Sequence, residues 1–446
     1  MKRRTLLRTF SAGAIAMPGI VAPALATGAG GYIDAGEMGL LSQGGGDQTR
    51  LLQQILKEAV DAGRPLFIPA GNYFVAGIVL PSNATIIGQS GDTMLTSATG
   101  EPVFTSSWQS NIVLQSLIFD GMNAGNTDGE MGLLVFEECA AIDIEGCRFQ
   151  NYKDNGLYLR NCAGRAKDNI FNDLGQSAIH AQNSAGLLIS ENFINTCANG
   201  GIRVWRHENG SDRTIVTNNH ITKISSDWGD GQNGNGINIF QADEVVVANN
   251  VISDCALSAI RANSTNNTII EGNQCLNSSE VAIFSEFAFS GSIISNNLVD
   301  GAATGISITN FDDGGRLAIC SNNIVRNIMP FSPTNPDTVP IGIFAEADTA
   351  INANIVENVP GVGIGVGWGT YLRNVLVSNN IVRLAKFGIG VSVAQGAGHA
   401  KISDNMIVEA LEGGIVGMHW DEIASRDLVE DQNNFPQISL SDNSFA

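Results

Sequence analysis

Arginine, histidine, glutamate and aromatic residues recur at one place in a short phrase that is repeated along this sequence. The phrase alternates aliphatic and variable residues, as in Gly201-Ile202-Arg203-Val204, and each copy has the length and alternation of a strand. Alternate residues of a strand point to the same side. The variable positions therefore predict two outward columns, one with Tyr158, His180, Arg203, Asn238, Arg261 and Phe284, the other with Arg160, Gln182, Trp205, Phe240, Asn263 and Glu286.

These two columns have the composition of a sugar-binding groove. Aromatic rings stack on the faces of sugar rings, while arginine, asparagine and glutamate bind hydroxyl or carboxylate groups. Neighbouring strands lie about 4.8 Å apart, so a saccharide chain could run along the stack. Ordinary packing of outward side chains is the alternative explanation. The expected substrate-binding residues are Tyr158, Trp205, His207, Asn238, Phe240 and Phe284.

The same columns contain residues suited to lyase or epimerase chemistry. An enzyme of either kind that acts on uronic acids needs a cation beside the carboxylate and a base for the C5 proton. Arg203 and Arg261 could supply the cation, and His180 or Tyr158 the base. The candidate catalytic residues are accordingly His180, Arg203, Arg261 and Glu286, the last for the reaction considered next.

Glycoside hydrolysis would require two carboxylates on either side of the scissile bond. Glu286 and Glu346 are candidates, and they stand two strands apart, about 10 Å at the backbone. That separation is slightly beyond the inverting range of roughly 6.5–9.5 Å, although long side chains could close it.

Two long inserts precede copies of the phrase and should overhang the predicted groove. They are Ser225–Asn235 and Pro330–Pro340, and Arg206-His207-Glu208 should stand at the opposite edge. In the first insert, the side chains of two aspartates and one asparagine could hold calcium, but their spacing fits no known loop signature. These residues are Asp227, Asp230 and Asn233. We therefore interpret the insert as a polar, glycine-rich loop and expect neither a metal nor a cofactor.

The seven cysteines lack the spacing of a metal site. We interpret them as small buried apolar residues. Only Cys139 and Cys162 stand close enough in the repeat for a disulfide, and the sequence leaves that pairing open.

A second repeated phrase indicates the elements that must position these residues. Alternating aliphatic residues lead into a short turn that ends in asparagine, at Asn169, Asn192, Asn219, Asn250, Asn273, Asn297, Asn323, Asn354, Asn380, Asn405 and Asn443. Such short strands cannot bury an apolar face alone, whereas stacked copies share one core. A parallel β-helix fits this unit, while a leucine-rich repeat would need regular leucines and a helical stretch. Stacked asparagines predict a hydrogen-bonded ladder, since asparagine also tolerates left-handed turns.

One helix is expected ahead of the repeats. Asp47 is its predicted cap, the helix runs over Thr49–Ala62, and Gly63 ends it, so that an apolar face covers the open end of the core. The next residues, Ile68-Pro69-Ala70-Gly71-Asn72-Tyr73 and Thr85-Ile86-Ile87-Gly88, resemble the opening segment of pectate-lyase-like β-helix proteins. The resemblance covers about residues 47–446 and implies an all-β, right-handed parallel β-helix with a short N-terminal capping helix. Parallel crossovers favour the same handedness.

The resemblance does not imply one activity. In related β-helix enzymes the corresponding strand and its loops form the substrate cleft, but calcium pectate lyases cluster acidic residues there and this sequence does not. Of the polygalacturonase motifs, only Asn126-Thr127-Asp128 and Asp312-Asp313 occur, far apart, and we interpret both as coincidental. Two hypotheses stay open. One is a non-catalytic module that binds saccharide or acts as a scaffold, and the other is a polysaccharide lyase, epimerase or hydrolase working around His180–Glu286.

The N-terminus indicates export. Met1–Ala26 combines a basic start, a modest apolar run and a small-residue end, as in a signal peptide. Arg3-Arg4 resembles a twin-arginine signal, which exports folded proteins in bacteria, and an ordinary secretory leader is the alternative. With the repeats, the chain resembles exported β-helix-repeat proteins of bacteria that have no assigned activity. A periplasmic or secreted location without a membrane anchor is the expectation.

Composition and charge narrow the partners. The 446 residues carry a formal net charge of −20, which argues against nucleic acid and anionic membranes because both would be repelled. A hydrophobic content of 43% with 15% charged residues argues against disorder. The length alone would suggest two or three domains. The repeat instead predicts a leader at 1–26, a Gly-rich linker at 27–46, a cap with the first coils at 47–110 and β-helix repeats at 111–446. A polysaccharide or oligosaccharide is the expected partner, and the oligomeric state is left open.

Overall fold

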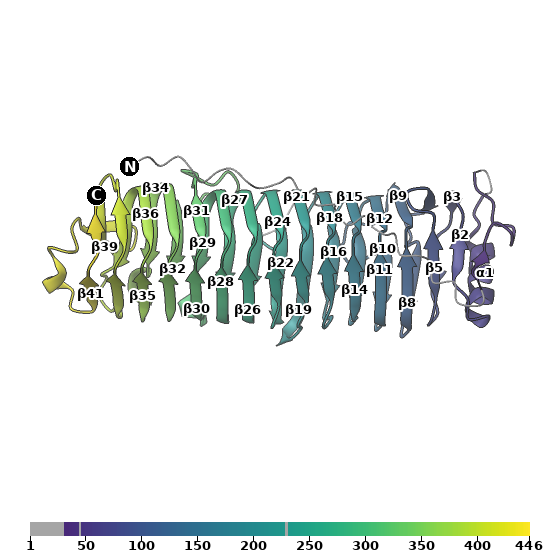
Figure 1. Cartoon of the computed structure of the whole chain (residues 1–446), viewed down its shortest axis with the longest axis horizontal. Coiled ribbons are helices and arrows are strands. Elements are labelled where there is room, and N and C mark those ends of the chain that lie inside the picture. Colours follow the sequence, from purple (N-terminus) through teal and green to yellow (C-terminus); the bar gives the residue numbers. More distant parts are fainter. Residues whose placement is uncertain (1–30, 44–45, 228–230) are drawn as a thin grey trace, which may run out of the picture.

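The computed structural model describes residues 31–43, 46–227 and 231–446. Figure 1 shows an elongated stack of short strands with the helix α1 (Thr49–Asp61) at its N-terminal end. The leader expected at residues 1–26 lies outside the described residues, as does part of the expected linker. The described part of that linker includes the short strand β1 (Ile33–Asp34), which pairs with β2 (Leu66–Ile68).

Three ladders of parallel strands run the length of the rod. Ladder one consists of β1, β2, β5 (Thr85–Gly88), β8 (Ser110–Gln115), β11 (Ala140–Glu145), β14 (Gly164–Lys167), β17 (Leu188–Ser190), β20 (Ile215–Thr217), β23 (Val246–Ala248), β26 (Asn266–Glu271), β28 (Ser290–Ser295), β30 (Arg316–Ser321), β33 (Thr349–Asn352), β35 (Val375–Ser378), β37 (Ala400–Ser403) and β41 (Ile438–Ser441). Ladder two consists of β3 (Gly71–Phe74), β6 (Thr93–Thr96), β9 (Ile118–Ala124), β12 (Arg148–Tyr152), β15 (Ile170–Leu174), β18 (Phe193–Cys197), β21 (His220–Ile224), β24 (Val251–Cys255), β31 (Ile324–Arg326), β38 (Met406–Val408) and β42 (Ser444–Phe445).

Ladder three is the one that contains the candidate site. It consists of β4 (Ile78–Val79), β7 (Phe104–Ser107), β10 (Gly132–Glu137), β13 (Asn155–Arg160), β16 (Ser177–Gln182), β19 (Gly200–Ser211), β22 (Asn235–Asp243), β25 (Ile260–Asn263), β32 (Ile341–Ala345) and β39 (Gly413–His419). Four long strands bend from ladder two into ladder three and belong to both, namely β27 (Gln274–Glu286), β29 (Leu298–Ile308), β34 (Ile355–Val366) and β36 (Ile381–Ser392). The hairpin of β39 with β40 (Glu422–Ser425) is antiparallel.

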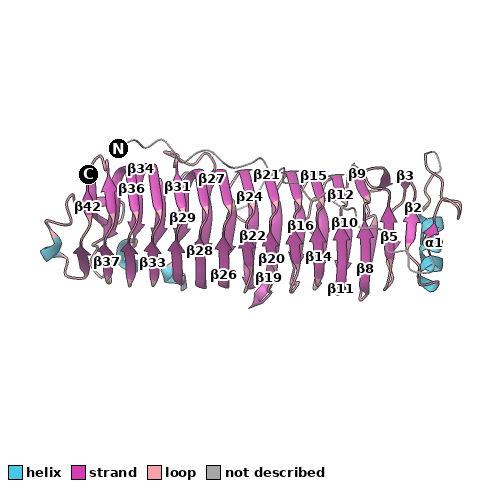
Figure 2. Cartoon of the chain, viewed as in Figure 1, coloured by secondary structure: helices cyan, strands magenta, loops and turns pink. Residues whose placement is uncertain are grey.

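Helix is a minor component of the described residues. Besides α1 there are three single-turn segments, η1 (Phe311–Asp313), η2 (Gly369–Tyr371) and η3 (Gln432–Asn434). Figure 2 shows them at turns and at the ends of a rod that is otherwise strand and loop. The prediction of an all-β parallel β-helix with one short N-terminal helix is confirmed.

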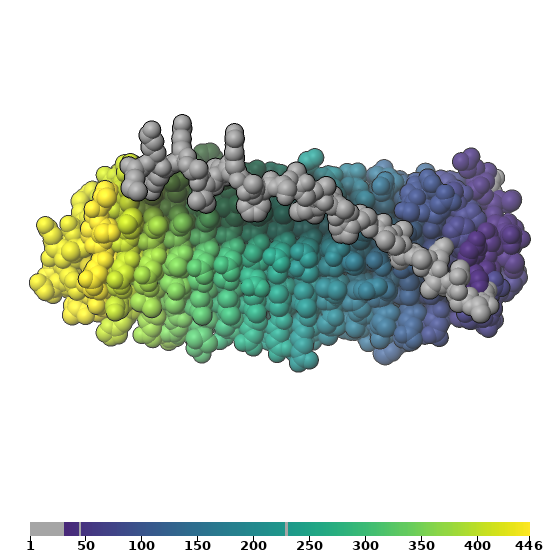
Figure 3. All heavy atoms as spheres, in the orientation of Figure 1, coloured from purple at the N-terminus to yellow at the C-terminus, as the bar shows by residue number. Residues whose placement is uncertain are grey.

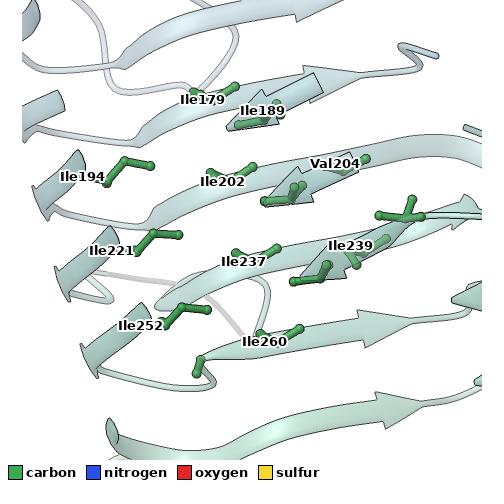
Figure 4. Packing of buried hydrophobic residues seen from close by; sticks show 14 of the residues in the cluster. Ile179, Ile189, Ile194, Ile202, Val204, Ile221, Ile237, Ile239, Ile252 and Ile260 are labelled. Carbon is green, nitrogen blue, oxygen red and sulfur yellow. The ribbon is translucent and has the colours of Figure 1, made fainter. Parts of the chain in front are cut away.

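The core is a set of aliphatic columns that run along the axis. Ile179, Ile202, Ile237 and Ile260 pair in register on four successive strands of ladder three, and all four are fully buried. Figure 4 shows these side chains stacked one above the other, with matching columns from the other ladders. Because every strand contributes its inward residues to the same columns, each short strand is buried by its neighbours in the stack.

The predicted asparagine ladder is present from Asn169 to Asn443. At each step the backbone N–H and the Nδ2 of one asparagine donate to the Oδ1 of the next, as Asn273 does to Asn297 at 2.9 and 3.0 Å. Nδ2 also donates to a carbonyl of the previous coil, Val247 in the case of Asn273. One detail of the prediction was wrong, because the left-handed residue is the one before the ladder asparagine, such as Gly272 or Asn296. Each of these turns therefore combines a left-handed residue with the ladder asparagine that directly follows it.

The helix α1 covers the N-terminal end of the core with Leu52, Ile55, Leu56 and Ala59. The predicted cap at Asp47 was off by one position, because the N-cap is Gln48. Asp47 still accepts a hydrogen bond from the backbone of Thr49 at 2.9 Å. All seven cysteines are buried free thiols, including Cys139 and Cys162, which do not form a disulfide.

Candidate functional site

The strand register places the two predicted columns side by side on ladder three. Tyr158, His180, Arg203, Asn238, Arg261 and Phe284 pair in that order on β13, β16, β19, β22, β25 and β27. Gln182, Trp205, Phe240, Asn263 and Glu286 form the adjacent column two residues further along. His207 lies outside both columns, because β19 bulges after Trp205 and carries His207 to an exposed extension.

The first column is not an open surface, although its side chains point away from the core. His180, Arg203 and Asn238 are only 6, 5 and 4% exposed. Loops cover them: the carbonyl oxygen of Gly129 lies 3.3 Å from Nδ1 of His180, and Nδ2 of Asn238 donates to the carbonyl of Gln232 at 3.0 Å. The residues of the second column stay partly exposed at Trp205, Phe240 and Asn263.

Both inserts contact the face that they were expected to overhang. In the described part of the first insert, the carbonyl of Gly231 accepts from Nη1 of Arg261 at 2.8 Å. In the second, Nδ2 of Asn335 donates to Glu280 at 2.7 Å and Oγ1 of Thr334 donates to the carbonyl of Ala256 at 2.8 Å. The covers and the extension of β19 therefore leave the second column partly exposed at Trp205, Phe240 and Asn263. Asp230, one residue of the calcium set considered above, lies outside the described residues.

Aromatic rings contact each other across four successive strands of ladder three. The ring centroids of Tyr158 and His180 are 5.3 Å apart, those of His180 and Trp205 5.3 Å, and those of Trp205 and Phe240 6.1 Å. The guanidinium of Arg203 lies 4.9 Å from the ring centroid of Trp205. A cation is thereby held against an aromatic face in the middle of the row.

Arg203 has no carboxylate partner within ion-pair distance among the described residues, which is rare for a buried arginine. Its Nη2 donates to the carbonyl of Asn199 at 3.2 Å and to Oδ1 of Asn233 at 2.5 Å, and its Nε is buried without a partner within the described part of the chain. Burial lowers the pKa of Arg203 to about 10, so the guanidinium is still charged at neutral pH. Arg203 is therefore a buried positive charge held by uncharged oxygen atoms and by the ring of Trp205.

His180 is a neutral imidazole in this environment. Burial, reinforced by the charge of Arg203, lowers the pKa of His180 to about 3. The side chain of Gln182 lies near the ring, but no hydrogen bond of normal geometry reaches Nε2 within the described residues. The indole Nε1 of Trp205 is likewise buried and unpartnered. Unpaired buried polar atoms are unusual, and three of those among the described residues lie on neighbouring strands, at His180, Arg203 and Trp205.

Arg261 and Glu286 are brought together and neutralise each other. Nε of Arg261 lies 2.5 Å from Oε1 of Glu286, and Nη1 lies 3.8 Å from Oε2 of Glu280. Asn263 also donates to Glu286, at 2.9 Å. Burial raises the pKa of Glu286, while the contact with Arg261 opposes that shift. Neither Arg261 nor Glu286 is therefore as free to bind substrate as Arg203.

Glu346 is buried, and the strand register places it two strands from Glu286, as predicted. It accepts a hydrogen bond from the backbone N–H of Phe311 at 2.8 Å, and burial raises its pKa to about 7. The pairing of these two carboxylates across one glycosidic bond stays a prediction.

A buried carboxyl group that the sequence reasoning missed lies beside Arg203. Asp154 is fully buried, accepts from the backbone N–H of Asn155 at 2.8 Å and from that of Gly129 at 3.3 Å, and shares a hydrogen bond with Asp128. Burial and the contact with Asp128 raise the pKa of Asp154 to about 7. A signal existed, because Asp154 stands four positions before Tyr158 as Asn199 does before Arg203. In the sequence, Asp128 is recognisable only as part of a coincidental motif.

Two pockets lie away from these columns. One of about 260 Å³ is beside Tyr152 and Gly100, and the other of about 550 Å³ lies between Lys223, Asp254 and Met329. No cluster of three or more histidine, cysteine, aspartate or glutamate side chains suited to a metal occurs among the described residues. No helix within that part of the chain is long and apolar enough to cross a membrane.

Comparisons with solved structures agree with the fold. An alginate lyase in complex with a trisaccharide is 13% identical, with 93% of this chain and 96% of that chain aligned and a TM-score of 0.51. An N-terminal fragment of bacteriophage phi29 gene product 12 is 15% identical, with 92 and 66% aligned and a TM-score of 0.51. The A-module of the mannuronan C-5 epimerase AlgE6 from Azotobacter vinelandii is 15% identical, with 93 and 99% aligned and a TM-score of 0.44. No curated protein matches the chain in sequence.

The family comparison covers more than half of the chain. The sequence model described as "Right handed beta helix region" matches residues 132–227 and 207–382. These ranges contain every candidate site residue on ladder three from Tyr158 to Glu346, and they agree with the parallel ladders seen in the structure. The chain therefore belongs to the right-handed β-helix family.

Proposed function

We propose that this protein binds a polysaccharide along the groove of ladder three, between Tyr158 and Phe284. The observation that carries the proposal is the guanidinium of Arg203, which lies against Trp205 within a row of aromatic rings. Aromatic faces suit sugar rings, and a guanidinium suits the carboxylate of a uronic acid. The alginate lyase with the same fold binds a trisaccharide in its own structure, which is consistent with this proposal.

The partly exposed second column forms the floor, and Arg203 lies at its inner side. A sugar stacked on Trp205 or Phe240 could turn its carboxylate toward the guanidinium. The net charge of −20 disfavours anionic chains in general, so a local cation is needed for uronates. The leader expected at residues 1–26 would bring the protein to such polysaccharides outside the cytoplasm.

The test is to measure the affinity of purified protein for alginate, polygalacturonate and uncharged dextran by calorimetry. Arg203→Met keeps the buried volume and removes the charge, and we expect it to weaken uronate binding roughly ten- to a hundredfold. Trp205→Ala should weaken binding of every chain that binds, by about tenfold.

Two exposed residues serve as matched controls, Arg213 and Trp108, of which Trp108 is 77% exposed. Arg213→Ala and Trp108→Ala should leave the affinities unchanged. The melting temperature of each variant shows whether a loss reflects folding. If the unaltered protein binds none of the three chains, the proposal is wrong.

A second candidate function is a lyase or an epimerase acting on uronic acids. The observation in its favour is the neutral imidazole of His180, with Nε2 unpartnered among the described residues, close to the guanidinium of Arg203. A neutral imidazole can accept a C5 proton while Arg203 stabilises the charge that develops on the carboxylate. For a lyase, His180→Ala should retain alginate binding but abolish the ultraviolet absorbance of unsaturated products. An epimerase would instead be detected by solvent-proton exchange at C5, and absence of both signals excludes this candidate.

A further inference from the structure

A second group of aromatic side chains lies at the C-terminal end of ladder three. It consists of Trp368 and Tyr371 near η2 and of Trp420 at the tip of the β39–β40 hairpin. The ring centroids of Trp368 and Trp420 are 5.7 Å apart, and those of Tyr371 and Trp420 6.1 Å, both with edge-to-face geometry. All three side chains are partly exposed.

This group is on the same side of the sheet as the groove. Met418 pairs with Ser392 on the outward positions of ladder three, and Trp420 follows two residues later. The hydroxyl of Ser392 donates to the carbonyl of Gly369 at 2.7 Å, which places η2 beside this outward position. The ring of Trp420 extends over Gly369, where an added Cβ would come within 2.2 Å of it.

Two glycines of ladder three allow neighbouring side chains to pack closely against the backbone on the way to this group. An added Cβ at Gly365 would lie 2.6 Å from the ring of Phe344, and one at Gly390 would lie 3.3 Å from the side chain of Met418. Phe344 and Met418 therefore rest directly on the backbone of their neighbours. The outward positions between Phe344 and Trp420, at Gly365, Gly390 and Ser392, are buried.

The hairpin that carries Trp420 does not follow the parallel pairing of the repeat. It is the antiparallel pairing among the described strands, and Trp420 at its tip has a φ of +59°. Left-handed non-glycine residues recur along this rod, and the exposed Trp108 has the same φ of +59°. The rim beside the rings is polar and exposed, with Thr370, Gln395, His419 and Asp421.

Aromatic faces with a polar rim suit a sugar, whose ring presents C–H groups on its faces and hydroxyls around its edge. A purely apolar partner would leave the polar rim unpaired. From Trp205 to Trp420 there are eight steps between neighbouring strands, or roughly 38 Å at about 4.8 Å a step. One extended saccharide chain could reach both groups, whereas a trisaccharide could not.

We infer that Trp368, Tyr371 and Trp420 form a distal saccharide subsite, which holds the far end of a chain already bound beside Arg203. This inference rests on the proposed function and extends it from a local site to a long groove. Two linked contacts strengthen binding of a chain that spans both, because the second contact becomes intramolecular.

The experiment compares the affinity of the full chain for alginate trisaccharide and for polymeric alginate. We expect the polymer to bind at least tenfold more tightly per chain, and Trp420→Ala to remove most of that advantage while leaving trisaccharide binding unchanged. Trp420→Phe should restore part of it, and Trp108→Ala is the matched control. Quenching of tryptophan fluorescence by the polymer should decrease in Trp420→Ala.

The outcomes separate the two proposals. If the polymer and the trisaccharide bind equally and only Arg203→Met weakens them, the distal subsite is wrong and the proposed function stands. The distal subsite is also wrong if Trp420→Ala lowers the melting temperature and retains the length dependence, because the rings would then only anchor the hairpin. If neither ligand binds the unaltered protein, both proposals fail.

Discussion

At the scale of single residues, Arg203 and Arg261 show how one residue type acquires two different roles. They occupy the same column two strands apart. Arg261 is paired with Glu286 and lies near Glu280, whereas the contacts of Arg203 among the described residues are with oxygen atoms of uncharged groups and the ring of Trp205. The column alone cannot distinguish them, because the difference lies in what surrounds each guanidinium. Arg203 is the arginine to which we assign binding.

Asp154 leads to a prediction about stability and pH. Its pKa is raised to about 7 from an ordinary value of 3.8, so the folded state holds the proton more tightly than the unfolded state. The contribution of Asp154 to stability is therefore present at low pH and is lost as the pH rises from about 4 through about 7. Asp154→Asn keeps a group that can donate to Asp128 and removes the titration.

The measurement is the free energy of unfolding of both proteins at a series of pH values. The advantage of the unaltered protein over Asp154→Asn should decline as the pH rises across that window and level off above it. The difference between the two proteins is the quantity to follow, because His180 has a lowered pKa and contributes with the opposite sign. A difference that stays constant with pH would contradict the proton assigned to Asp154.

At the scale of elements, the asparagine ladder and the two inserts, which we call the cover loops, differ in how their contacts are distributed along the sequence. Ladder asparagines recur at each coil from Asn169 to Asn443, and each bonds to polar groups of the turn before and the turn after it. Cover loops occur once each and contact coils that are distant in sequence, as Asn335 contacts Glu280 across 55 residues. The repeat therefore predicts the first kind of contact and says nothing about the second.

Asn273→Ala should lower the free energy of unfolding by about 2 kcal/mol or more, since it removes buried hydrogen bonds and leaves their partners unsatisfied. Asn195→Ala is the control, because Asn195 is a partly exposed asparagine whose Nδ2 makes one long contact of 3.4 Å. The control should change stability by no more than about 0.5 kcal/mol. Chemical denaturation checks both variants, and equal effects would contradict a specific role for the ladder.

At the scale of the whole molecule, a single core grows along the axis. Figure 3 shows the resulting long rod, with its side chains arranged in bands that follow the coils. Stacking avoids the size limit of a globular core, because each added coil is buried by its neighbours. The 446 residues would suggest several domains by length, but they form one continuous stack of strands.

The N-terminal end of this core depends on α1. Ile55→Asp should place a charge in its buried face, destabilise the first coils by about 3 kcal/mol or more and promote association through the exposed end. Lys57→Ala is the control, because Lys57 is exposed and pairs only with Asp61 across one turn. Size-exclusion chromatography and thermal unfolding check the prediction. A monomeric Ile55→Asp variant of unchanged stability would show that the cap is dispensable.

Alternation and recurrence in the sequence were enough to predict the parallel β-helix, the asparagine ladder, the capping helix and the alignment of the two columns. Backbone pairing converts such patterns directly into register. The burial of His180 and Arg203 under loops, the pairing of Arg261 with Glu286 and the contact of Asp154 with Asp128 became evident only in three dimensions. Those contacts depend on inserts with no repeat, whose conformations are set by packing across several coils. Local periodicity therefore specifies the scaffold, while non-repeating contacts specify which charges a ligand can meet.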